Sequence, residues 1–257
     1  MSDEVALIAP RYFERVAEIH KTVAATDGAE YAVNIRSPYR AAEYLKYAPL
    51  LRQHLGNSAA NVLDWGALWG HVSVLIEELG YCPTPYILGP LMPEQWRDPL
   101  DRQFPGRYVV HDDPIALPFE DGRFDAVISS GVFEHVPEGG GSFTGSLREI
   151  HRILRPDGYF FLWKLPHASG LSEMKSDLLG RWSHAFRFTP AGIRIMLENA
   201  GFEVVHLEYD GLMPEGVRSR LRRYRMTPLL RLDQWMAAAW PFRVLANDLT
   251  VVARKKA

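Results

Sequence analysis

The stretch from residue 61 to residue 70 constrains the fold of this chain more than any other. It reads Asn-Val-Leu-Asp-Trp-Gly-Ala-Leu-Trp-Gly, an apolar run that reaches Asp64 and then a turn framed by Gly66 and Gly70. Such a run is typical of a buried parallel strand that leads into a helix across a ligand crevice. Glycine permits positive φ and lets a ligand approach the main chain, and the first amides of a helix at 71–79 face the same space. The stretch predicts a small-molecule site, with an ordinary tight connection as the alternative.

Length and cysteine content narrow the class of protein. The chain has 257 residues, 47% of them hydrophobic, which is enough for a buried core in one large domain or two small ones. The single cysteine, Cys82, excludes an internal disulfide framework. The histidines are scattered and no Cys/His cluster is visible, so we expect no metal site. A reducing compartment fits this composition best.

Charge and hydropathy narrow the expected partners. A net charge of −2 gives no overall electrostatic footprint for nucleic acid. The first residues, Met-Ser-Asp-Glu, lack the basic and apolar regions of a signal peptide, and no apolar run approaches the ~20 residues of a membrane span. We therefore expect a cytoplasmic protein with no nucleic-acid partner and no transmembrane segment.

Strand and helix patterns alternate along the chain. Predicted strands occupy residues 61–64, 86–89, 108–111, 124–130, 159–165, 202–208 and 249–254. Predicted helices occupy residues 71–79, 147–154 and 189–201, the last with Thr189 as N-cap, and a Pro-rich irregular connection up to residue 105 and a turn at 156–158 lie between elements. Continuous apolar strands separated by helices indicate a mostly parallel sheet. We predict an α/β fold, a doubly wound sheet of seven strands with helices on both faces.

Two regions accompany the predicted sheet. Apolar positions at helical spacing over 3–22 and 38–55, with a glycine-containing break between them, predict a helical N-terminal extension at 1–57. The α/β domain then spans 58–257, with a helical insertion at about 211–246. Because the insertion combines arginines with an apolar, tryptophan-bearing helix, four roles stay open: a lid for an anionic acceptor, a membrane-surface contact, a homodimer face, and a solvated helix packed on the core.

Six motifs follow one another between residues 58 and 210. They are the segments 62–70, 121–129, 132–136, 148–158 and 200–205, and Asp113 followed by Leu117-Pro118-Phe119. Together they resemble the class I methyltransferases that use S-adenosylmethionine, and more closely the small-molecule branch with the Leu-Pro-Phe motif. This resemblance implies a Rossmann-like fold and S-adenosylmethionine as the cofactor.

The resemblance also implies roles for individual residues. Glycines and Ala67 of the turn would lie against the methionine part of the cofactor. Asp113 would accept a hydrogen bond from the adenine amino group, with Asp112 as its substitute, and two serines would line the crevice beyond the fourth strand. The predicted cofactor site is Asp64, Gly66, Ala67, Gly70, Asp112, Asp113, Ser129 and Ser130. The alternative for the aspartate pair is an acidic end to a solvated strand.

The chain departs from the family pattern in two places. The family usually has glycine where Leu68 stands. A leucine side chain there would keep the backbone farther from a ligand than glycine does. The family also tends to place an acid after the second strand to hold the ribose hydroxyls, and here that position falls near Pro90-Leu91, with Glu94 as the nearest acid. Trp65 and Trp69 beside the turn are unusual too; they fit either a sulfonium contact or core packing.

Three histidines and one lysine are candidates for the chemistry. His135, just beyond the fourth strand, is the candidate general base, with a loop-shaping role as the alternative. His167 and His184 follow the fifth strand, where such enzymes often build acceptor pockets, and exposed loop positions are the alternative. Lys164 ends that strand, either to meet an acidic acceptor or as a snorkelling side chain.

Three functions compete. The first is an S-adenosylmethionine-dependent methyltransferase that acts on a small molecule, such as a sugar or a biosynthetic intermediate. The second is a non-catalytic relative that has lost the cofactor and serves as a binding or scaffolding subunit. A nicotinamide oxidoreductase is disfavoured, because Gly66-x-x-x-Gly70 is not Gly-x-Gly-x-x-Gly.

Overall fold

The described part of the chain divides into two compact units. The computed structural model describes residues 3–26 and 35–256. The first unit extends through Asp113 and also contains residues 123–127; the second consists of residues 114–122 and those from Ile128 onward. The predicted boundary between residues 57 and 58 is not one of these divisions and stays a prediction.

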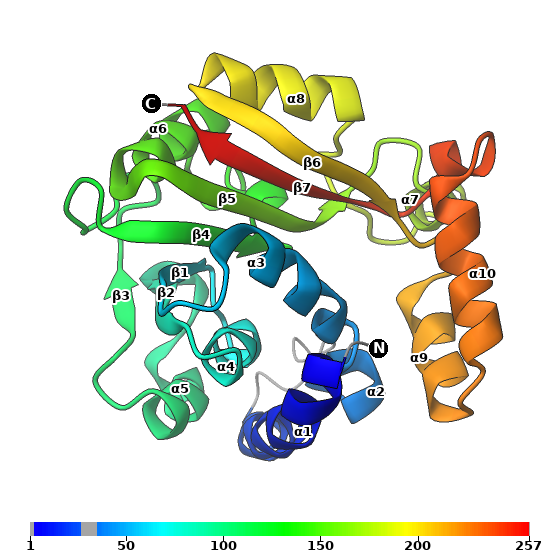
Figure 1. Cartoon of the computed structure of the whole chain (residues 1–257), viewed down its shortest axis with the longest axis horizontal. Helices are drawn as coiled ribbons and strands as arrows, with labels where there is room; N and C mark the ends of the chain where they lie inside the picture. Colours follow the sequence, from blue (N-terminus) through cyan, green and yellow to red (C-terminus); the bar gives the residue numbers. More distant parts are fainter. Residues whose placement is uncertain (1–2, 27–34, 257) are drawn as a thin grey trace. The chain divides into compact units, whose positions relative to one another are not determined.

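The described residues form a mixed sheet of seven strands in the order β3-β2-β1-β4-β5-β7-β6 (Figure 1). The strands are β1 Asn61–Trp65, β2 Cys82–Leu88, β3 Val109–His111, β4 Phe124–Ser130, β5 Leu154–Pro166, β6 Phe202–Asp210 and β7 Asp248–Lys255. β2 runs parallel to β1 and β3, whereas β7 runs antiparallel to β5 and β6. The predicted α/β fold with seven strands is confirmed.

In the first unit, helices precede and follow β1. They are α1 Asp3–Val23, α2 Pro38–Ala41, α3 Ala48–Leu55, α4 His71–Glu78 and α5 Asp98–Gln103, with 3-10 turns η3 Tyr44–Tyr47, η4 Gly89–Leu91 and η5 Glu94–Trp96. α1 packs on α4 and α5, and α4 packs on β1 and β2. The predicted helix at 3–22 is confirmed, and the one at 38–55 is divided into α2, η3 and α3. Most of the predicted break between them lies outside the described residues.

β2 begins four residues before its predicted start. Pro83 and Pro85 obscured it, because proline cannot donate to a ladder. The backbone N–H of Cys82 donates to Ala60 O, so alternate residues of β2 point their N–H groups towards β1, and the two prolines face the opposite side. On that side, β2 pairs with β3 only from Tyr86 onward, so the two prolines, which lack an N–H, remove no hydrogen bond from the sheet.

The Pro-rich connection after β2 is more regular than predicted. It contains η4, η5 and α5 in place of an irregular loop. α5 has Pro99 in its first turn, where the missing N–H would have no helical partner. Such short helices lack the apolar periodicity by which a sequence reveals longer ones.

The second unit contains the remaining helices. They are η6 Phe133–His135, α6 Phe143–Ile153, α7 Leu171–Leu178, α8 Pro190–Asn199, α9 Glu215–Arg223, α10 Thr227–Ala238 and η7 Phe242–Leu245. α6 starts four residues before its predicted start because Ser142 Oγ accepts a hydrogen bond from Gly145 N at 3.1 Å. α8 has the predicted cap, with Thr189 Oγ1 accepting from Gly192 N at 3.0 Å. The predicted turn at 156–158 lies inside β5, with Asp157 at φ 61°.

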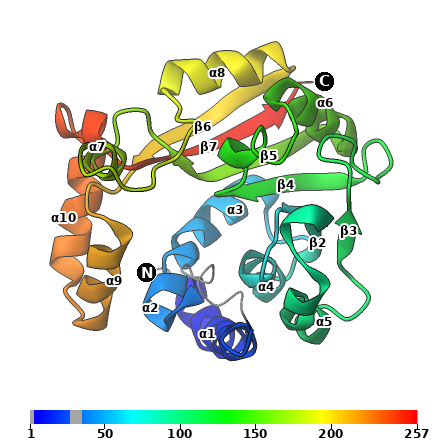
Figure 2. The same cartoon turned by 180° about the vertical axis from the view of Figure 1, so that it is seen from behind.

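The predicted helical insertion consists of α9, α10 and η7, which follow β6 (Figure 2). α10 packs on α9 and on β6. Arg218 of α9 is buried, and its guanidinium lies 3.3 Å from Asp210 and 3.9 Å from Asp248. Asp233 of α10 is also buried and accepts the backbone N–H groups of Leu212 and Met213. Among the described residues, none of the helices is long and apolar enough to cross a membrane.

Candidate functional site

The glycine turn after β1 is held against the neighbouring strand. The backbone N–H groups of Gly66 and Ala67 both donate to Tyr86 O, at 3.0 and 2.9 Å. Gly70 N donates to Ala67 O at 2.8 Å, and Gly70 occupies the N-cap of α4 with φ 80°. Gly66 also has positive φ, at 82°. The turn therefore needs glycine where the sequence has it, and it presents the first turn of α4 as an anion-favouring helix start.

Leu68 adopts the left-handed conformation that glycine takes readily. Its φ is 46°, so the residue that replaces the family's glycine keeps a backbone of the same kind. Left-handed backbone costs a residue other than glycine about 1–2 kcal/mol. The departure at Leu68 thus changes the side chain in the turn but leaves the path of the backbone compatible with a close ligand.

Asp64 ties β1 to the start of α4. Its side chain is buried, and Ser73 Oγ donates to Asp64 Oδ2 at 2.5 Å. The Ser73 backbone also hydrogen-bonds this carboxyl, but burial outweighs both bonds and raises the pKa of Asp64 to about 7. Because its carboxylate is hydrogen-bonded to Ser73, Asp64 helps to hold the glycine turn between β1 and α4. A direct contact between Asp64 and a ligand stays a prediction.

Asp112 reaches the backbone that follows β2. A Cβ placed on Gly89 would meet Asp112 Oδ1, so the Asp112 carboxylate lies close against the backbone of Gly89. Gly89 was not among the residues predicted for the site. Asp112 and Asp113 are both exposed; burial, and after it the charges of Asp113 and Asp112, raises the pKa of the Tyr86 phenol to about 12. Two carboxylates therefore lie at the end of β3, beside the end of β2.

Both tryptophans of the turn are buried. Trp65 is 6% exposed and Trp69 is 1% exposed. The Trp69 ring lies 5.9 Å from the ring of Trp96, measured between centroids. Of the two interpretations of the sequence, core packing is the one that the burial favours.

In the second unit, the Leu-Pro-Phe segment is clamped by α6. Arg152 donates to Leu117 O at 2.9 Å and to Phe119 O at 2.7 Å, while Glu149 Oε2 accepts from Leu117 N at 3.0 Å. Arg152 also pairs with Asp121 at 2.8 Å. Two of the motifs found in the sequence are thus one hydrogen-bonded assembly.

The two predicted serines have different surroundings. Ser129 is 1% exposed, and its Oγ accepts from Phe133 N at 3.1 Å, which fixes the start of η6. Ser130 Oγ is buried and has no hydrogen-bond partner among the described residues. Ser130 is therefore the better placed of the two for a ligand contact, and both roles stay predictions.

Beyond β4, the candidate base His135 lies in a cluster that the sequence did not reveal. Glu134, His135 and His184 each offer one ligand atom within 4.8 Å of the others. His135 Nδ1 lies 2.8 Å from Glu138 Oε2, and His184 Nδ1 lies 2.8 Å from Glu173 Oε1. Burial and three nearby carboxylates outweigh a backbone hydrogen bond and raise the pKa of Glu134 to about 8. Fifty residues separate His184 from the Glu-His pair, so only the fold brings them together.

The other candidates have structural partners. His167 is buried and its Nδ1 lies 3.0 Å from Ala246 O; burial lowers its pKa. Lys164 lies within β5 at an irregular pairing with β7, where its φ is 54°, and its ammonium is 3.4 Å from Glu215 of α9. Neither residue joins the His135 cluster within the distances that define it.

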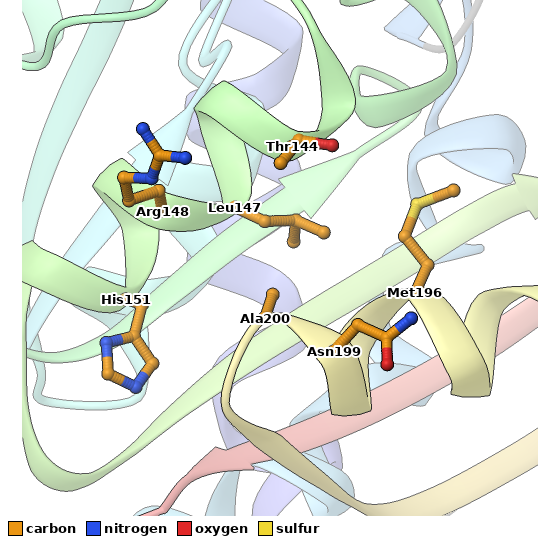
Figure 3. Close-up of a pocket in the computed structure, with 7 residues that line it drawn as sticks. All are labelled: Thr144, Leu147, Arg148, His151, Met196, Asn199 and Ala200. Carbon is orange, nitrogen blue, oxygen red and sulfur yellow. The ribbon is translucent and has the colours of Figure 1, made fainter.

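A cavity of about 330 Å³ lies between α6 and α8 (Figure 3). It is lined by Thr144, Leu147, Arg148, His151, Met196, Asn199 and Ala200. None of the residues predicted for the site lines it. We therefore place no part of the candidate site there.

Comparison with known proteins identifies methyltransferases among the proteins similar to this chain. Residues 63–162 match a family model described as "Methyltransferase domain". A ubiquinone biosynthesis O-methyltransferase of Xanthomonas oryzae is 28% identical over 206 residues, which are 76% of this chain and 81% of that protein. A phthiotriol/phenolphthiotriol dimycocerosates methyltransferase of Mycobacterium ulcerans is 36% identical over 76 residues, and this match spans 30% of the chain and only 27% of that relative.

A solved structure shares the fold. It is the 1,6-didemethyltoxoflavin-N1-methyltransferase of Burkholderia thailandensis, with bound 1,6-didemethyltoxoflavin and S-adenosylhomocysteine. Its TM-score is 0.54 and its identity 23%, with 90% of this chain and 92% of that chain covered. At this identity the likeness concerns the fold alone.

Proposed function

We propose that this chain, which carries a methyltransferase domain of the class I S-adenosylmethionine-dependent family, transfers a methyl group to a small-molecule acceptor. The ubiquinone biosynthesis relative is by name an O-methyltransferase, and the toxoflavin methyltransferase structure contains a small heterocycle. These relatives favour a small acceptor, and the first of them favours oxygen as the acceptor atom. A sugar or another biosynthetic intermediate is the acceptor class to test.

The observation that carries the proposal is the paired arrangement in the first unit. The glycine turn follows β1, and the exposed Asp112 and Asp113 follow β3, on the other side of β2. In open α/β sheets, ligands bind outside the carboxyl ends of the strands. A ligand with an amino-acid part at one end and hydroxyls and an exocyclic amine at the other matches this set of groups.

The residues present fit S-adenosylmethionine. The turn at Gly66–Gly70 admits the amino-acid part, because three of its residues have positive φ. Asp113 accepts a hydrogen bond from the adenine amine, as the family pattern implies. We assign the ribose hydroxyls to Asp112, whose carboxylate lies against Gly89 at the end of β2. Asp112 then replaces the acid that the family places after the second strand.

The chemistry requires positioning more than proton transfer. When bound, the cofactor supplies an electrophilic methyl group on a sulfonium. The chain's part is to hold the acceptor atom in line with that methyl group, and such alignment can contribute roughly 7–11 kcal/mol. A general-base role for His135 stays a prediction; Glu138 holds its Nδ1 at 2.8 Å.

The same features weigh against a scaffolding subunit. That alternative rested on Leu68 and on the absent ribose acid. Leu68 keeps a left-handed backbone, and Asp112 provides a carboxylate beside the end of β2. Neither departure therefore removes the groups that a cofactor needs.

Cofactor binding is tested by calorimetric titration of the full chain with S-adenosylmethionine and S-adenosylhomocysteine, with NAD as the negative control. We expect micromolar binding of the first two. Asp113→Ala and Gly66→Val should abolish it, and Asp112→Ala should weaken it about tenfold, the loss of one charge-assisted hydrogen bond. Glu14→Ala is the matched control, because Glu14 is an exposed carboxylate on α1 of the same unit, outside the proposed site.

The outcomes separate the candidate functions. Binding that Asp113→Ala abolishes and Glu14→Ala leaves unchanged supports the proposal and justifies a screen of hydroxylated acceptors for S-adenosylhomocysteine release. If neither S-adenosylmethionine nor S-adenosylhomocysteine binds at millimolar concentration, the proposed methyltransferase activity is wrong and a scaffolding subunit is favoured. Binding of NAD in preference to both would instead indicate an oxidoreductase.

We also propose a cytoplasmic location. Its support is Cys82, the chain's single cysteine, which is an exposed free thiol. Fractionation of cells that express the tagged chain would test it.

The homodimer is a further prediction, for which sedimentation of the purified chain is the measurement.

A further inference from the structure

A cluster of two histidines and a buried glutamate lies in the second unit, outside the residues assigned to the cofactor. Glu134 and His135 belong to η6, and His184 lies between α7 and α8. One atom from each lies within 4.8 Å of the others. Two imidazoles and a carboxylate are the ligand set of many three-residue metal centres that keep positions open for water or substrate.

Each imidazole has a carboxylate on one ring nitrogen, as metal-binding histidines usually do. Glu138 holds His135 at Nδ1 and Glu173 holds His184 at Nδ1, each at 2.8 Å. A carboxylate on the remote ring nitrogen fixes the tautomer, increases the basicity of the ring and directs Nε2 at the metal. Here two neighbouring histidines each have a carboxylate on Nδ1, and a pair of surface ion pairs does not need the two rings to lie side by side.

The loop that carries His184 is fastened to α7. Glu173 Oε2 accepts from His184 N at 2.9 Å. Arg187 makes two hydrogen bonds to Asp177, at 2.6 and 2.7 Å, and Ser183 Oγ donates to Asp177 at 2.7 Å. His184 is therefore presented by a braced segment, which lowers the entropy cost of ligation.

Glu134 is buried beside one of the two histidines. It is 2% exposed, and among the residues that the structure describes the basic group within 4 Å of its carboxylate is His135, with Nε2 3.9 Å from Oε1. A metal ion bound there would supply a charged partner to a carboxylate that is otherwise removed from water. Ligand atoms of tetrahedral zinc at bonds of 2.0–2.1 Å lie about 3.3 Å apart, and the three atoms of the cluster lie within 4.8 Å of one another, so binding would bring them closer by at most about 1.5 Å.

We propose that Glu134, His135 and His184 bind one divalent transition-metal ion of the Zn²⁺ or Co²⁺ type, with the remaining positions open to water or to a substrate oxygen. Imidazole ligands favour such ions over Mg²⁺ and Ca²⁺. The site goes beyond the proposed function, because its binding of metal does not depend on the cofactor. It also replaces the expectation from the sequence that the chain has no metal site.

The test is titration of the EDTA-treated full chain with Co²⁺, followed by visible absorption, and with Zn²⁺, followed by calorimetry. We expect one ion per chain with micromolar or tighter affinity. His184→Ala and Glu134→Gln should weaken it at least a hundredfold, and Glu173→Gln about 10–100-fold, the range for loss of an orienting carboxylate. His206→Ala is the matched control: it removes another histidine beside a glutamate, Glu208 at 3.4 Å, in the same unit.

The outcomes decide the proposal without reference to methyl transfer. Loss of binding in the cluster variants, with wild-type affinity in His206→Ala, supports it. Absence of binding up to ~100 μM metal, or equal affinity in wild type and His184→Ala, overturns it. Circular dichroism identifies any variant that fails to fold, and the milder Glu173→Gln then carries the comparison.

Discussion

Leu68 shows how one residue can keep a backbone shape that its own side chain disfavours. It occupies a left-handed position in the glycine turn, with φ 46°. Asparagine tolerates this conformation, whereas a β-branched residue does not. We expect Leu68→Asn to change the free energy of unfolding little, and Leu68→Val to lower it by about 1 kcal/mol, because a branched Cβ fits the left-handed region less well than the Cβ of leucine. Urea unfolding measures both, and equal stabilities would contradict the left-handed backbone.

Asp64 makes stability depend on pH. Its pKa is about 7 in the folded chain against 3.8 unfolded, so the folded state holds an extra proton between these values. Stability therefore falls as pH rises from about 4 to 7, because the folded state must then bury an ionised carboxylate. Asp64→Asn should lose this part of the pH dependence, measured as the difference in unfolding free energy between pH 5 and pH 7.5. An unchanged difference would show that Asp64 titrates normally.

At the scale of elements, α6 determines the shape of the segment that carries the Leu-Pro-Phe motif. Arg152 alone hydrogen-bonds the carbonyls of Leu117 and Phe119 and the carboxylate of Asp121. We expect Arg152→Ala to cost about 1–3 kcal/mol, since bonds to a charged group are lost. Amide exchange should accelerate at Leu117. Arg148→Ala, at an exposed position of the same helix, should do neither, and similar effects in both variants would refute the clamp.

At the scale of the whole molecule, the cofactor should stabilise the fold. A ligand that binds only the folded chain at 100 times its Kd adds about 2.7 kcal/mol. For a chain of this length, that raises the melting temperature by roughly 5–10 °C. S-adenosylhomocysteine should produce this shift in wild type and not in Gly66→Val, while NAD should produce none. A shift that survives Gly66→Val would place the ligand elsewhere.

The architecture could be predicted from the sequence alone, because the local periodicity of apolar residues distinguishes strands from helices. The apolar runs at β1, β4 and β7, the Thr189 cap and the glycine turn were all predictable from neighbouring residues. Prolines hid the start of β2, and the short helices of the Pro-rich connection carry too few residues for a pattern. Local chemistry thus predicted which elements form, and less accurately where they begin.

Only the tertiary structure decided which side chains meet. The contact between Gly89 and Asp112 depends on the register of two strands, and His184 reaches Glu134 and His135 because α7 braces a distant loop. Likewise, Arg218, one of the arginines of the insertion, is buried against Asp210. Each of these contacts joins positions that sequence spacing does not relate, so their chemistry appears only when the backbone has brought them together.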